Sequence, residues 1–363
     1  MNIGIGRVAM LAILGGIFLS PTVRGESSAA PSYEVYVSNE RTGDLTVLAG
    51  PDFHGVATIP VGKRPRGIHA SPDGKTVYVA LSGTPVSEPP KLDAQGNPIL
   101  HKGKDADDEK EAEADKAADG IGVVDVAQRK FVHKISAGSD PEQFALSPDG
   151  KRLYISNEDV GTATILDAAT GKIVSFVVVG QEPEGVAIAP DGKSFYVTCE
   201  TAGKVFVFDT ASGQQEAMLQ VEPRPRSAAF LKDGTKAFIP SESVGKLNVI
   251  DAVQHALLKT IILPAGSRPM CVAVAPDGKD VYVSTGRAGT ICVVDAHTYE
   301  VVGKIPVGQR PWGIAISPDG KYLFAANGPS NDVSVVDLAA GKEVARVKAG
   351  GSPWGVVVVP RGS

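Results

Sequence analysis

The sequence predicts an all-β protein, a seven-bladed β-propeller whose ring is closed by N-terminal strands b, c and d together with a C-terminal strand a. Three repeated marks predict this fold. A Pro-Asp-Gly-Lys turn recurs along the chain, an aspartate ends an apolar alternation every 42 to 44 residues, and a proline opens a new apolar strand seven times. A repeat of this length with four short strands is typical of a propeller blade.

Each mark occurs at regular positions. The turn Pro-Asp-Gly-Lys starts at Pro72, Pro148, Pro190, Pro276 and Pro318, with a degraded copy at Lys232-Asp233-Gly234-Thr235. The aspartates that close the alternations are Asp125, Asp167, Asp209, Asp251, Asp295 and Asp337. The prolines that open a strand are Pro65, Pro141, Pro183, Pro225, Pro269, Pro311 and Pro353. Seven openings predict seven blades.

The copy that begins at Pro311 shows the four strands of one blade. Trp312–Ser317 is strand a, and the turn at 318–321 follows, in which proline fixes φ and glycine accepts a positive φ. Tyr322–Ala326, Asp332–Asp337 and Lys342–Lys348 are strands b, c and d. The apolar residues of this copy do not recur with a period of 3.6, so no helix is predicted in it.

The two ends of the repeat region supply complementary parts of one blade. Tyr33–Ile59 contains strands b, c and d without a strand a, and Pro353–Val359 contains a strand a alone. Joined, they make the seventh blade and remove two sheet edges that would otherwise be open to pairing with other chains. An open solenoid is the alternative, and these half-blades argue against it.

The predicted domain organisation is a signal peptide over residues 1–25 followed by one propeller over 32–363. Arg7 gives a short positive flank, Val8–Leu19 is an apolar run too short to span a bilayer comfortably, and cleavage before Glu26 fits the residues ahead of it. We therefore expect a periplasmic or secreted protein with no membrane span after cleavage. A retained membrane anchor is the alternative.

A charged insertion interrupts the first complete blade at residues 83–119. It carries ten acidic and five basic side chains, which accounts for the whole formal net charge of −5. The remainder is close to neutral and lacks the basic surface that nucleic acid requires. The insertion extends a b–c loop, so it overhangs the same channel mouth as the other b–c loops. A solvated loop, a lid and a docking segment for a basic partner are the open interpretations; the spacing of a calcium-binding loop is missing.

Cysteine and histidine patterns give little sign of catalysis or metal binding. The three cysteines, Cys199, Cys271 and Cys292, leave at least one free thiol, and no Cys-x-x-Cys-His or zinc-type spacing occurs. His69 replaces an alanine of other blades and is read as a core or channel-wall residue rather than a catalytic one. No Gly-x-Ser-x-Gly sequence is present. We expect no cofactor and no metal.

The predicted site lies at one mouth of the central channel. In an antiparallel blade, strand a begins and strand b ends on the same face, so the d–a and b–c loops surround that mouth. Glu40, Glu158, Glu200 and Glu242 end four b strands there. The residues that flank the opening prolines differ from blade to blade, and we predict that they bind a ligand or partner: Arg64, Arg66, Asp140, Glu142, Glu182, Glu184, Arg224, Arg226, Arg268, Arg310, Trp312 and Trp354.

Arginines in such a site hold carboxylates bidentately, and indole rings stack on planar or apolar groups. The alternative is that the charges of neighbouring blades neutralise one another and that the two tryptophans pack between blades.

The strands also carry a family resemblance. Tyr36-Val37-Ser38-Asn39, Tyr154-Ile155-Ser156-Asn157 and Tyr196-Val197-Thr198-Cys199 resemble the Tyr-Val-Thr-Asn type of propeller repeat. Longer stretches resemble the PQQ-dependent catabolism-associated β-propeller proteins: Lys63–Ile68, Asp140–Leu146, Glu182–Gly185, Arg224–Arg226 and Asn327–Asp337. This resemblance implies a periplasmic protein of bacteria that oxidise alcohols with quinoprotein dehydrogenases. The insertion departs from the pattern.

The functional expectation is a binding or scaffold protein rather than an enzyme. The resemblance implies a quinoprotein dehydrogenase or a transport-system component as partner, and the mouth suggests a small anionic or quinone ligand; we expect a monomer. The alternative is a lactonase-type hydrolase that uses carboxylates such as Glu142, Glu184 or Glu200, with or without a divalent metal.

One comparison argues against this alternative. In propeller lactonases an active-site histidine follows the strand-opening proline, whereas in this sequence arginine, glutamate, methionine or tryptophan follows it. A purely structural propeller is the third interpretation.

Overall fold

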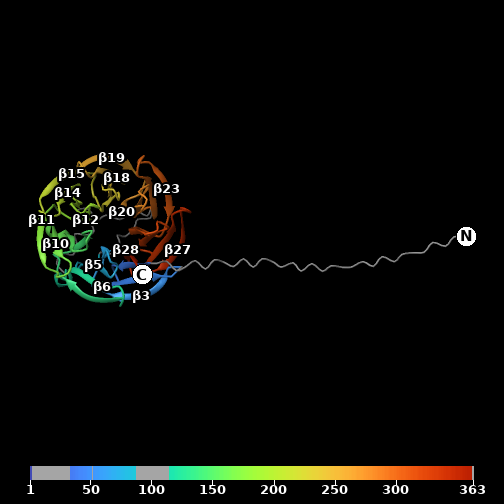
Figure 1. Cartoon of the computed structure of the whole chain (residues 1–363), viewed down its shortest axis with the longest axis horizontal. Coiled ribbons are helices and arrows are strands. Elements are labelled where there is room, and N and C mark those ends of the chain that lie inside the picture. The colour runs from blue at the N-terminus through green and yellow to red at the C-terminus, as the bar shows by residue number, and fades with distance from the viewer. Residues whose placement is uncertain (2–32, 51, 87–113, 362–363) are drawn as a thin grey trace, which may run out of the picture.

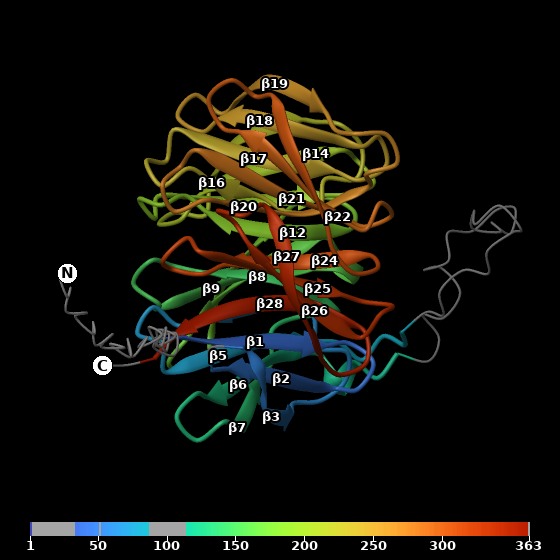
Figure 2. The ribbon, with the colours of Figure 1, turned by 90° about the vertical axis from the view of Figure 1, so that its right-hand side faces the viewer.

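The structure is a computed structural model that describes residues 1, 33–50, 52–86 and 114–361. This part of the chain forms seven four-stranded antiparallel sheets arranged in a ring (Figures 1 and 2). The predicted seven-bladed propeller is therefore confirmed. The predicted signal peptide, apart from Met1, and residues 87–113 of the insertion lie outside the described residues. No helix in the described ranges has the length and apolarity to cross a membrane.

The blades are numbered here from the first one that is complete in sequence. Blade 1 contains β4 (Ile68–Ala70), β5 (Thr76–Leu81), β6 (Gly120–Asp125) and β7 (Lys130–Ile135); blade 2 contains β8 (Pro141–Leu146), β9 (Arg152–Asn157), β10 (Thr162–Asp167) and β11 (Ile173–Val178). Blade 3 contains β12 (Pro183–Ile188), β13 (Ser194–Cys199), β14 (Lys204–Asp209) and β15 (Gln215–Gln220); blade 4 contains β16 (Ala229–Phe230), β17 (Lys236–Ser241), β18 (Lys246–Asp251) and β19 (Ala256–Ile262).

Blade 5 contains β20 (Pro269–Val274), β21 (Asp280–Thr285), β22 (Thr290–Asp295) and β23 (Val301–Pro306); blade 6 contains β24 (Pro311–Ile316), β25 (Tyr322–Asn327), β26 (Asp332–Asp337) and β27 (Lys342–Lys348). Blade 7 contains β28 (Pro353–Pro360), β1 (Tyr33–Asn39), β2 (Asp44–Ala49) and β3 (His54–Pro60). Two 3-10 turns complete the described elements, at Lys116–Ala118 and Glu158–Val160.

Blade 7 closes the ring as the sequence predicts. The C-terminal strand β28 pairs antiparallel with the N-terminal β1, for example Val35 with Val358 and Val37 with Val356. Strand β1 in turn pairs with β2. The two chain ends therefore share one sheet, which leaves no blade incomplete.

The core lies between the blades, because the middle strands of each sheet are covered on both faces. In β25, five successive residues from Leu323 are buried, as expected for a strand with a neighbouring sheet on each side. The outermost strand β27 instead alternates exposed and half-buried residues. Phe238 of blade 4 packs with Val272 and Val281 of blade 5 in one such inter-blade cluster.

The Tyr-Val-Thr-Asn type of repeat has a structural role. Its third residue, which is serine in two of the copies, shows this role most clearly. The Ser38 hydroxyl donates to the Arg66 carbonyl of the next blade at 2.6 Å, and Ser156 makes the equivalent bond to Glu184, also at 2.6 Å. The carbonyls that accept these bonds belong to residues that follow the opening prolines. The motif therefore fixes the backbone at the channel mouth, one blade to the next.

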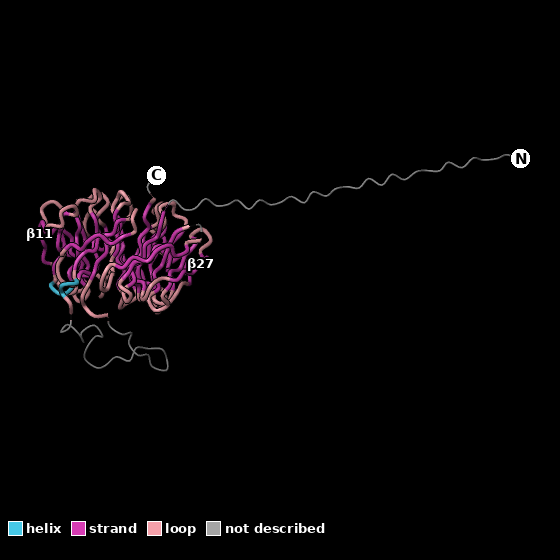
Figure 3. Tube along the Cα trace, turned by 90° about the horizontal axis from the view of Figure 1, so that it is seen from below, coloured by secondary structure: helices cyan, strands magenta, loops and turns pink. Residues whose placement is uncertain are grey.

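The two faces of the ring differ in what they carry (Figure 3). The Pro-Asp-Gly turns lie on one face, together with the C-terminal strand end: an ideal Cβ on Gly74 would lie 2.9 Å from the Pro360 carbonyl. The insertion leaves blade 1 from the opposite face, where strand b ends and strand c begins. Only that second face combines the d–a and b–c loops, so the candidate site belongs there.

Candidate functional site

The residue before each opening proline adopts the same unusual backbone conformation. All seven have a left-handed φ between 43° and 58°: Arg64, Asp140, Glu182, Arg224, Arg268, Arg310 and Ser352. This conformation costs a residue with a side chain about 1–2 kcal/mol, and glycine would avoid the cost. None of the seven is glycine. The fold therefore keeps a side chain at a strained position in every blade, a pattern that often accompanies function.

Arg66 is the centre of the first charged cluster. Its side chain is only 2% exposed, and its Nη2 lies 2.5 Å from Asp140 Oδ1. Its Nη1 contacts Glu142 and lies 3.6 Å from Glu158 Oε2. One buried guanidinium of blade 1 thus faces three carboxyl groups of blade 2.

This excess of carboxyl groups over cations changes their protonation. Burial raises the pKa of Glu142 well above its ordinary value, since the opposing charge of Arg66 does not compensate for the lost hydration and for nearby Glu184 and Glu158. Burial also raises the pKa of Glu158, again against the effect of Arg66. The side chain of Glu158 is still 32% exposed. The cluster therefore offers solvent a carboxyl group that titrates nearer to neutral pH.

Arg226 is the centre of the second cluster. Its Nη1 lies 2.6 Å from Glu184 Oε2 and also contacts Glu200, both on blade 3. Its Nε lies 2.8 Å from Glu242 Oε2 on its own blade. As with Arg66, one arginine forms ion pairs with more than one carboxylate at the strand ends of an adjacent blade.

Glu242 has the opposite electrostatic balance, because three arginines surround it. Arg268 donates to its Oε1 from Nε at 3.0 Å and from Nη2 at 2.7 Å, and Arg224 Nε lies 3.5 Å from its Oε2. Burial opposes ionisation, but the charges of Arg226, Arg224 and Arg268 prevail and lower the pKa of Glu242 to about 2. Glu242 therefore stays ionised, as does Asp140, where burial opposes ionisation but Arg66 lowers the pKa, whereas the pKa values of Glu142 and Glu158 are raised.

Rim contacts complete the charged side of the mouth. Arg64 Nε donates to Glu40 Oε1 at 2.9 Å, Arg224 Nη2 lies 2.7 Å from Glu200 Oε2, and Thr201 donates to Glu182. In the structure these arginines are therefore paired with carboxylates of the mouth. Such mutual pairing is the alternative that the sequence left open. A ligand or partner at these residues stays a prediction.

The other side of the mouth is aromatic. Trp312 and Trp354 stack with ring centroids 5.7 Å apart and planes inclined by 23°. The guanidinium of Arg310 lies 4.7 Å from the Trp312 ring centroid, and that of Arg226 lies 5.8 Å away. Both distances suit cation–π attraction. The two sides of the mouth therefore meet where Arg226 approaches Trp312.

The side chains that follow the opening prolines of blades 3 to 7 surround a small cavity. Glu184, Arg226, Met270, Trp312 and Trp354 line a cavity of only about 20 Å³. Such a volume holds about one water molecule. A molecule larger than water does not fit this cavity as it stands.

Sequence reasoning missed the contribution of the insertion's two arms. Asp119, on the second arm, accepts from the Gly83 backbone N–H at 2.7 Å and from the Asp140 N–H at 3.0 Å. Thr84, on the first arm, donates to Asp140 Oδ2 at 3.0 Å. Both arms therefore hold the carboxylate that pairs with Arg66. No local pattern signals this, because Gly83 and Asp119 are separated by the whole insertion.

The thiols and His69 lie in inert surroundings. Burial raises the pKa of Cys199 to about 12 and that of Cys292 to about 11, so neither is a ready thiolate. Burial lowers the pKa of His69 to about 4, and its ring meets Phe144 edge to face at 4.9 Å. Within the described ranges, no group of three or more His, Cys, Asp or Glu side chains is arranged so that it could hold a metal ion.

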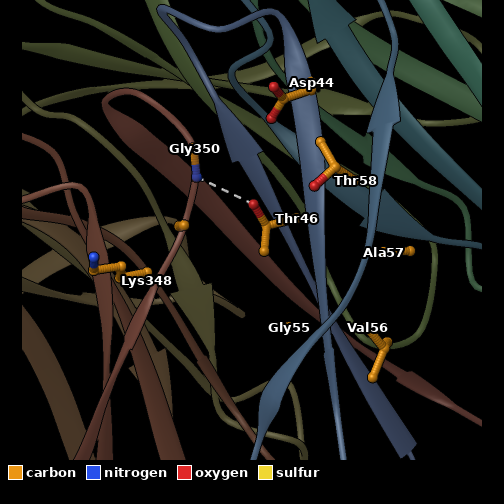
Figure 4. Close-up of a pocket in the computed structure, with 9 residues that line it drawn as sticks. Asp44, Thr46, Gly55, Val56, Ala57, Thr58, Lys348 and Gly350 are labelled. Atoms are coloured by element: carbon orange, nitrogen blue, oxygen red, sulfur yellow. Dashed lines mark hydrogen bonds between the residues drawn. The ribbon is translucent and has the colours of Figure 1, made fainter.

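A second hollow lies between blades 6 and 7 (Figure 4). It has a volume of about 540 Å³ and is lined largely by small residues and backbone of β2, β3 and the segment after β27. Gly350 N–H donates to Thr46 Oγ1 at 3.1 Å across it. Asp44 and Lys348 are its charged lining residues. It lacks the clustered acid–base groups of the mouth, so we place the chemistry at the mouth.

Comparison with known proteins identifies the type of propeller. A family model described as "Lactonase, 7-bladed beta-propeller" matches residues 32–189 and 180–348. No curated protein matches the chain in a sequence search.

Among solved structures, a putative 6-phosphogluconolactonase from Bacteroides uniformis is 18% identical with a TM-score of 0.70, over 90% of this chain and 99% of that one. A periplasmic gluconolactonase from Pseudomonas aeruginosa is 21% identical with a TM-score of 0.67, over 90% and 99%. Hydrazine synthase from Kuenenia stuttgartiensis is 21% identical with a TM-score of 0.66, over 82% and 90%. At these identities the structural likeness shows the fold alone.

The family match overturns two expectations from the sequence. A quinoprotein-linked binding or scaffold role is not supported, and the expectation that the chain is not an enzyme is wrong: the lactonase model favours the hydrolase alternative. The expectation rested on the family resemblance, on the absence of a Gly-x-Ser-x-Gly sequence and on the absence of a histidine after the opening prolines. In a propeller any blade can supply a reactive side chain to the mouth, so a missing histidine after the prolines does not exclude hydrolysis.

Proposed function

Because the chain belongs to the seven-bladed β-propeller lactonase family, we propose that it is a hydrolase that opens a lactone ring at the charged mouth. The observation that carries this proposal is the cluster of Arg66, Glu142 and Glu158. Its carboxyl groups have raised pKa values, and one of them reaches solvent. A carboxylate whose pKa lies nearer to the working pH is a better general base.

Glu158 is the group to which we assign proton transfer. Its carboxylate takes a proton from water while the water oxygen bonds to the lactone carbonyl carbon. When the tetrahedral intermediate collapses, the bond from that carbon to the ring oxygen breaks, and Glu158 returns the proton to the leaving oxygen. The product is a hydroxy acid, so atoms and charge balance. Glu142 and Arg66 are too buried to touch the substrate and act as positioning residues.

The developing negative charge on the carbonyl oxygen requires a donor. Arg224 and Arg268 present 29% and 38% of their side chains to solvent, more than Arg66 or Arg226. We assign oxyanion stabilisation to these exposed guanidinium edges. Removing one such donor typically lowers kcat by about 100-fold to 1000-fold.

The test is whether the purified protein hydrolyses simple sugar lactones. The reaction is monitored through the acid it releases in lightly buffered solution, and its rate is compared with the uncatalysed rate. We expect Glu158→Gln to lower kcat by about 100-fold or more. Glu300→Gln, which changes an exposed glutamate between β22 and β23, is the matched control and should be fully active. Because the pKa of Glu158 is raised, wild-type activity should increase as pH rises through that pKa.

Two results would refute the proposal: no turnover of any lactone, or full activity in Glu158→Gln. Repeating the assay with a chelator tests whether the reaction requires a divalent cation. Activity that is lost with the chelator and restored by added metal would show that the reaction is metal-dependent.

The cellular setting is also part of the proposal. We propose export to the periplasm, on the N-terminal pattern of Arg7 and Val8–Leu19 and on the printed name of the P. aeruginosa neighbour. Cleavage before Glu26 can be checked by mass spectrometry of the mature chain. The narrower resemblance to PQQ-dependent catabolism-associated propellers stays a prediction.

A further inference from the structure

Carboxyl groups of the mouth already engage the arginines of blades 1, 4 and 5. Five arginines flank the opening prolines of blades 1, 4 and 5, and seven carboxyl groups lie within ion-pair distance of them. The arginines are Arg64, Arg66, Arg224, Arg226 and Arg268, and the carboxyl groups are those of Glu40, Asp140, Glu142, Glu158, Glu184, Glu200 and Glu242.

A phosphate or carboxylate group on a substrate would have to compete with these partners. Recognition of such anions needs two guanidinium N–H groups aimed at the ligand. Arg268 directs both Nε and Nη2 to Glu242, and Arg226 directs Nη1 and Nε to three glutamates. A permanent anion would therefore displace a carboxylate from its arginine. The displaced carboxylate would lose its partner and would also repel the anion, which weakens binding.

The rim also carries an exposed carboxylate. Glu182 is exposed beside the mouth, and Asp119 is bound to backbone N–H groups, not to a cation, in the described contacts. Lys63 and Lys116, which lie near the insertion's arms, pair with Asp115 and Asp159. Both of these lysines are therefore already paired with carboxylates.

The aromatic side supplies a different kind of contact. Trp312 is half-buried and stacks on Trp354, which is only 6% exposed, so Trp312 is the indole of this pair that solvent reaches more. Indole faces bind the C–H faces of hydroxylated rings without requiring charge. Carboxylates at the opposite side accept hydrogen bonds from hydroxyl groups.

We infer that the substrate is an uncharged, hydroxylated lactone, and that the mouth discriminates against lactones carrying a phosphate or a second carboxylate. The inference rests on the proposed hydrolase function and specifies its substrate. The exposed edges of Arg224 and Arg268 suit a single charge that develops only in the transition state, which is where stabilisation accelerates a reaction.

The experiment compares one lactone with and without a phosphate group. Glucono-1,5-lactone and its 6-phosphate are assayed side by side, and we expect kcat/KM for the uncharged lactone to be about 100-fold higher. Higher ionic strength should narrow this difference, because salt screens repulsion at an exposed mouth. A preference set by shape alone would not respond to salt.

Binding is measured separately with gluconolactam and its 6-phosphate, in which N–H replaces the ring oxygen and hydrolysis is slow. We expect the uncharged lactam to raise the melting temperature and the phosphorylated one to have no effect at equal concentration. If neither lactone is hydrolysed but the uncharged lactam alone binds, the hydrolase proposal fails and the inference on charge stands. If the phosphorylated lactam binds as tightly, or neither lactam binds, the inference is overturned.

Variants test the cause of the discrimination. Glu182→Gln removes one exposed negative charge from the rim and should raise kcat/KM for the phosphorylated lactone a few-fold relative to the uncharged one. Asp277→Asn makes the same change of charge in a Pro-Asp-Gly turn on the opposite face and should leave the ratio unchanged. An unchanged ratio in Glu182→Gln, or an equal change in both variants, would contradict the electrostatic explanation.

Discussion

The two sides of the channel mouth show how one backbone frame supports different chemistry. We call the ion-paired side from Arg64 to Arg268 the charged arc, and the side that holds Trp312 and Trp354 the indole arc. Both arcs place a left-handed residue before a proline and one side chain after it. The frame is thus common to all blades, and the identity of two residues per blade decides what each arc can bind.

The arcs also differ in how they respond to change. Buried ion pairs gain little net stability because desolvation offsets their attraction, but losing one partner is costly. Stacked indoles contribute by packing, which tolerates conservative replacement and does not depend on pH. The charged arc should therefore be the fragile one, and the following substitutions test this contrast.

The largest effect is expected for Arg66→Met in the charged arc. It leaves Asp140, Glu142 and Glu158 without their shared cation, so the free energy of unfolding at pH 7 should fall by about 3–5 kcal/mol. The loss should shrink towards pH 5, because carboxyl groups that lack a cation become protonated. Urea unfolding at both pH values measures it.

Arg310→Met is the matched change in the indole arc. It removes a cation from the Trp312 face and should cost about 0.5–1 kcal/mol. Equal losses for the two variants would mean that the arcs do not differ as described.

The next effect concerns Glu242, whose pKa is lowered to about 2 by three arginines. Its ionised form is favoured in the folded state, so its contribution to stability is complete above its ordinary pKa and is lost as pH falls through about 2. Glu242→Gln should cost about 3 kcal/mol at pH 7. Stability curves of wild type and variant should converge as pH falls from about 4.5 to 2. A difference that stays constant with pH would contradict the ionic explanation.

A smaller effect is expected for Trp312→Ala in the indole arc. Removing the partner of Trp354 should lower the free energy of unfolding by about 2 kcal/mol. The loss should be the same from pH 5 to pH 8, since no titrating group drives it. Trp312→Phe keeps an aromatic ring and should lose less. Near-ultraviolet circular dichroism, which reports on coupled tryptophans, checks that the stack itself is lost.

The smallest effect tests the shared backbone frame. Ser352 has φ of 55° and belongs to the indole arc, so Ser352→Gly should relieve strain and stabilise the protein by up to about 1 kcal/mol. Arg224→Gly, at the equivalent position of the charged arc, removes the contacts to Glu200 and Glu242 and should destabilise it. Thermal unfolding compares the pair, and the same sign for both would show that backbone strain outweighs side-chain pairing.

Much of the fold could be predicted because a propeller is a repeat. Strands c and d of blade 6 are found at the predicted residues, Asp332–Asp337 and Lys342–Lys348, because alternation and turn residues mark them locally. The opening prolines also located the mouth correctly. The partners of Arg66 could not be predicted, since Asp140 and Glu158 reach it only after two blades pack side by side.

The sequence by itself determined the number of blades, the closure by β28 and β1, and which residues would surround the mouth, because all of these follow from short-range patterns repeated at a fixed interval. Tertiary structure decided which charges pair and which carboxyl groups have raised or lowered pKa values. These properties depend on distances and desolvation between blades far apart in the chain, and no local pattern encodes them.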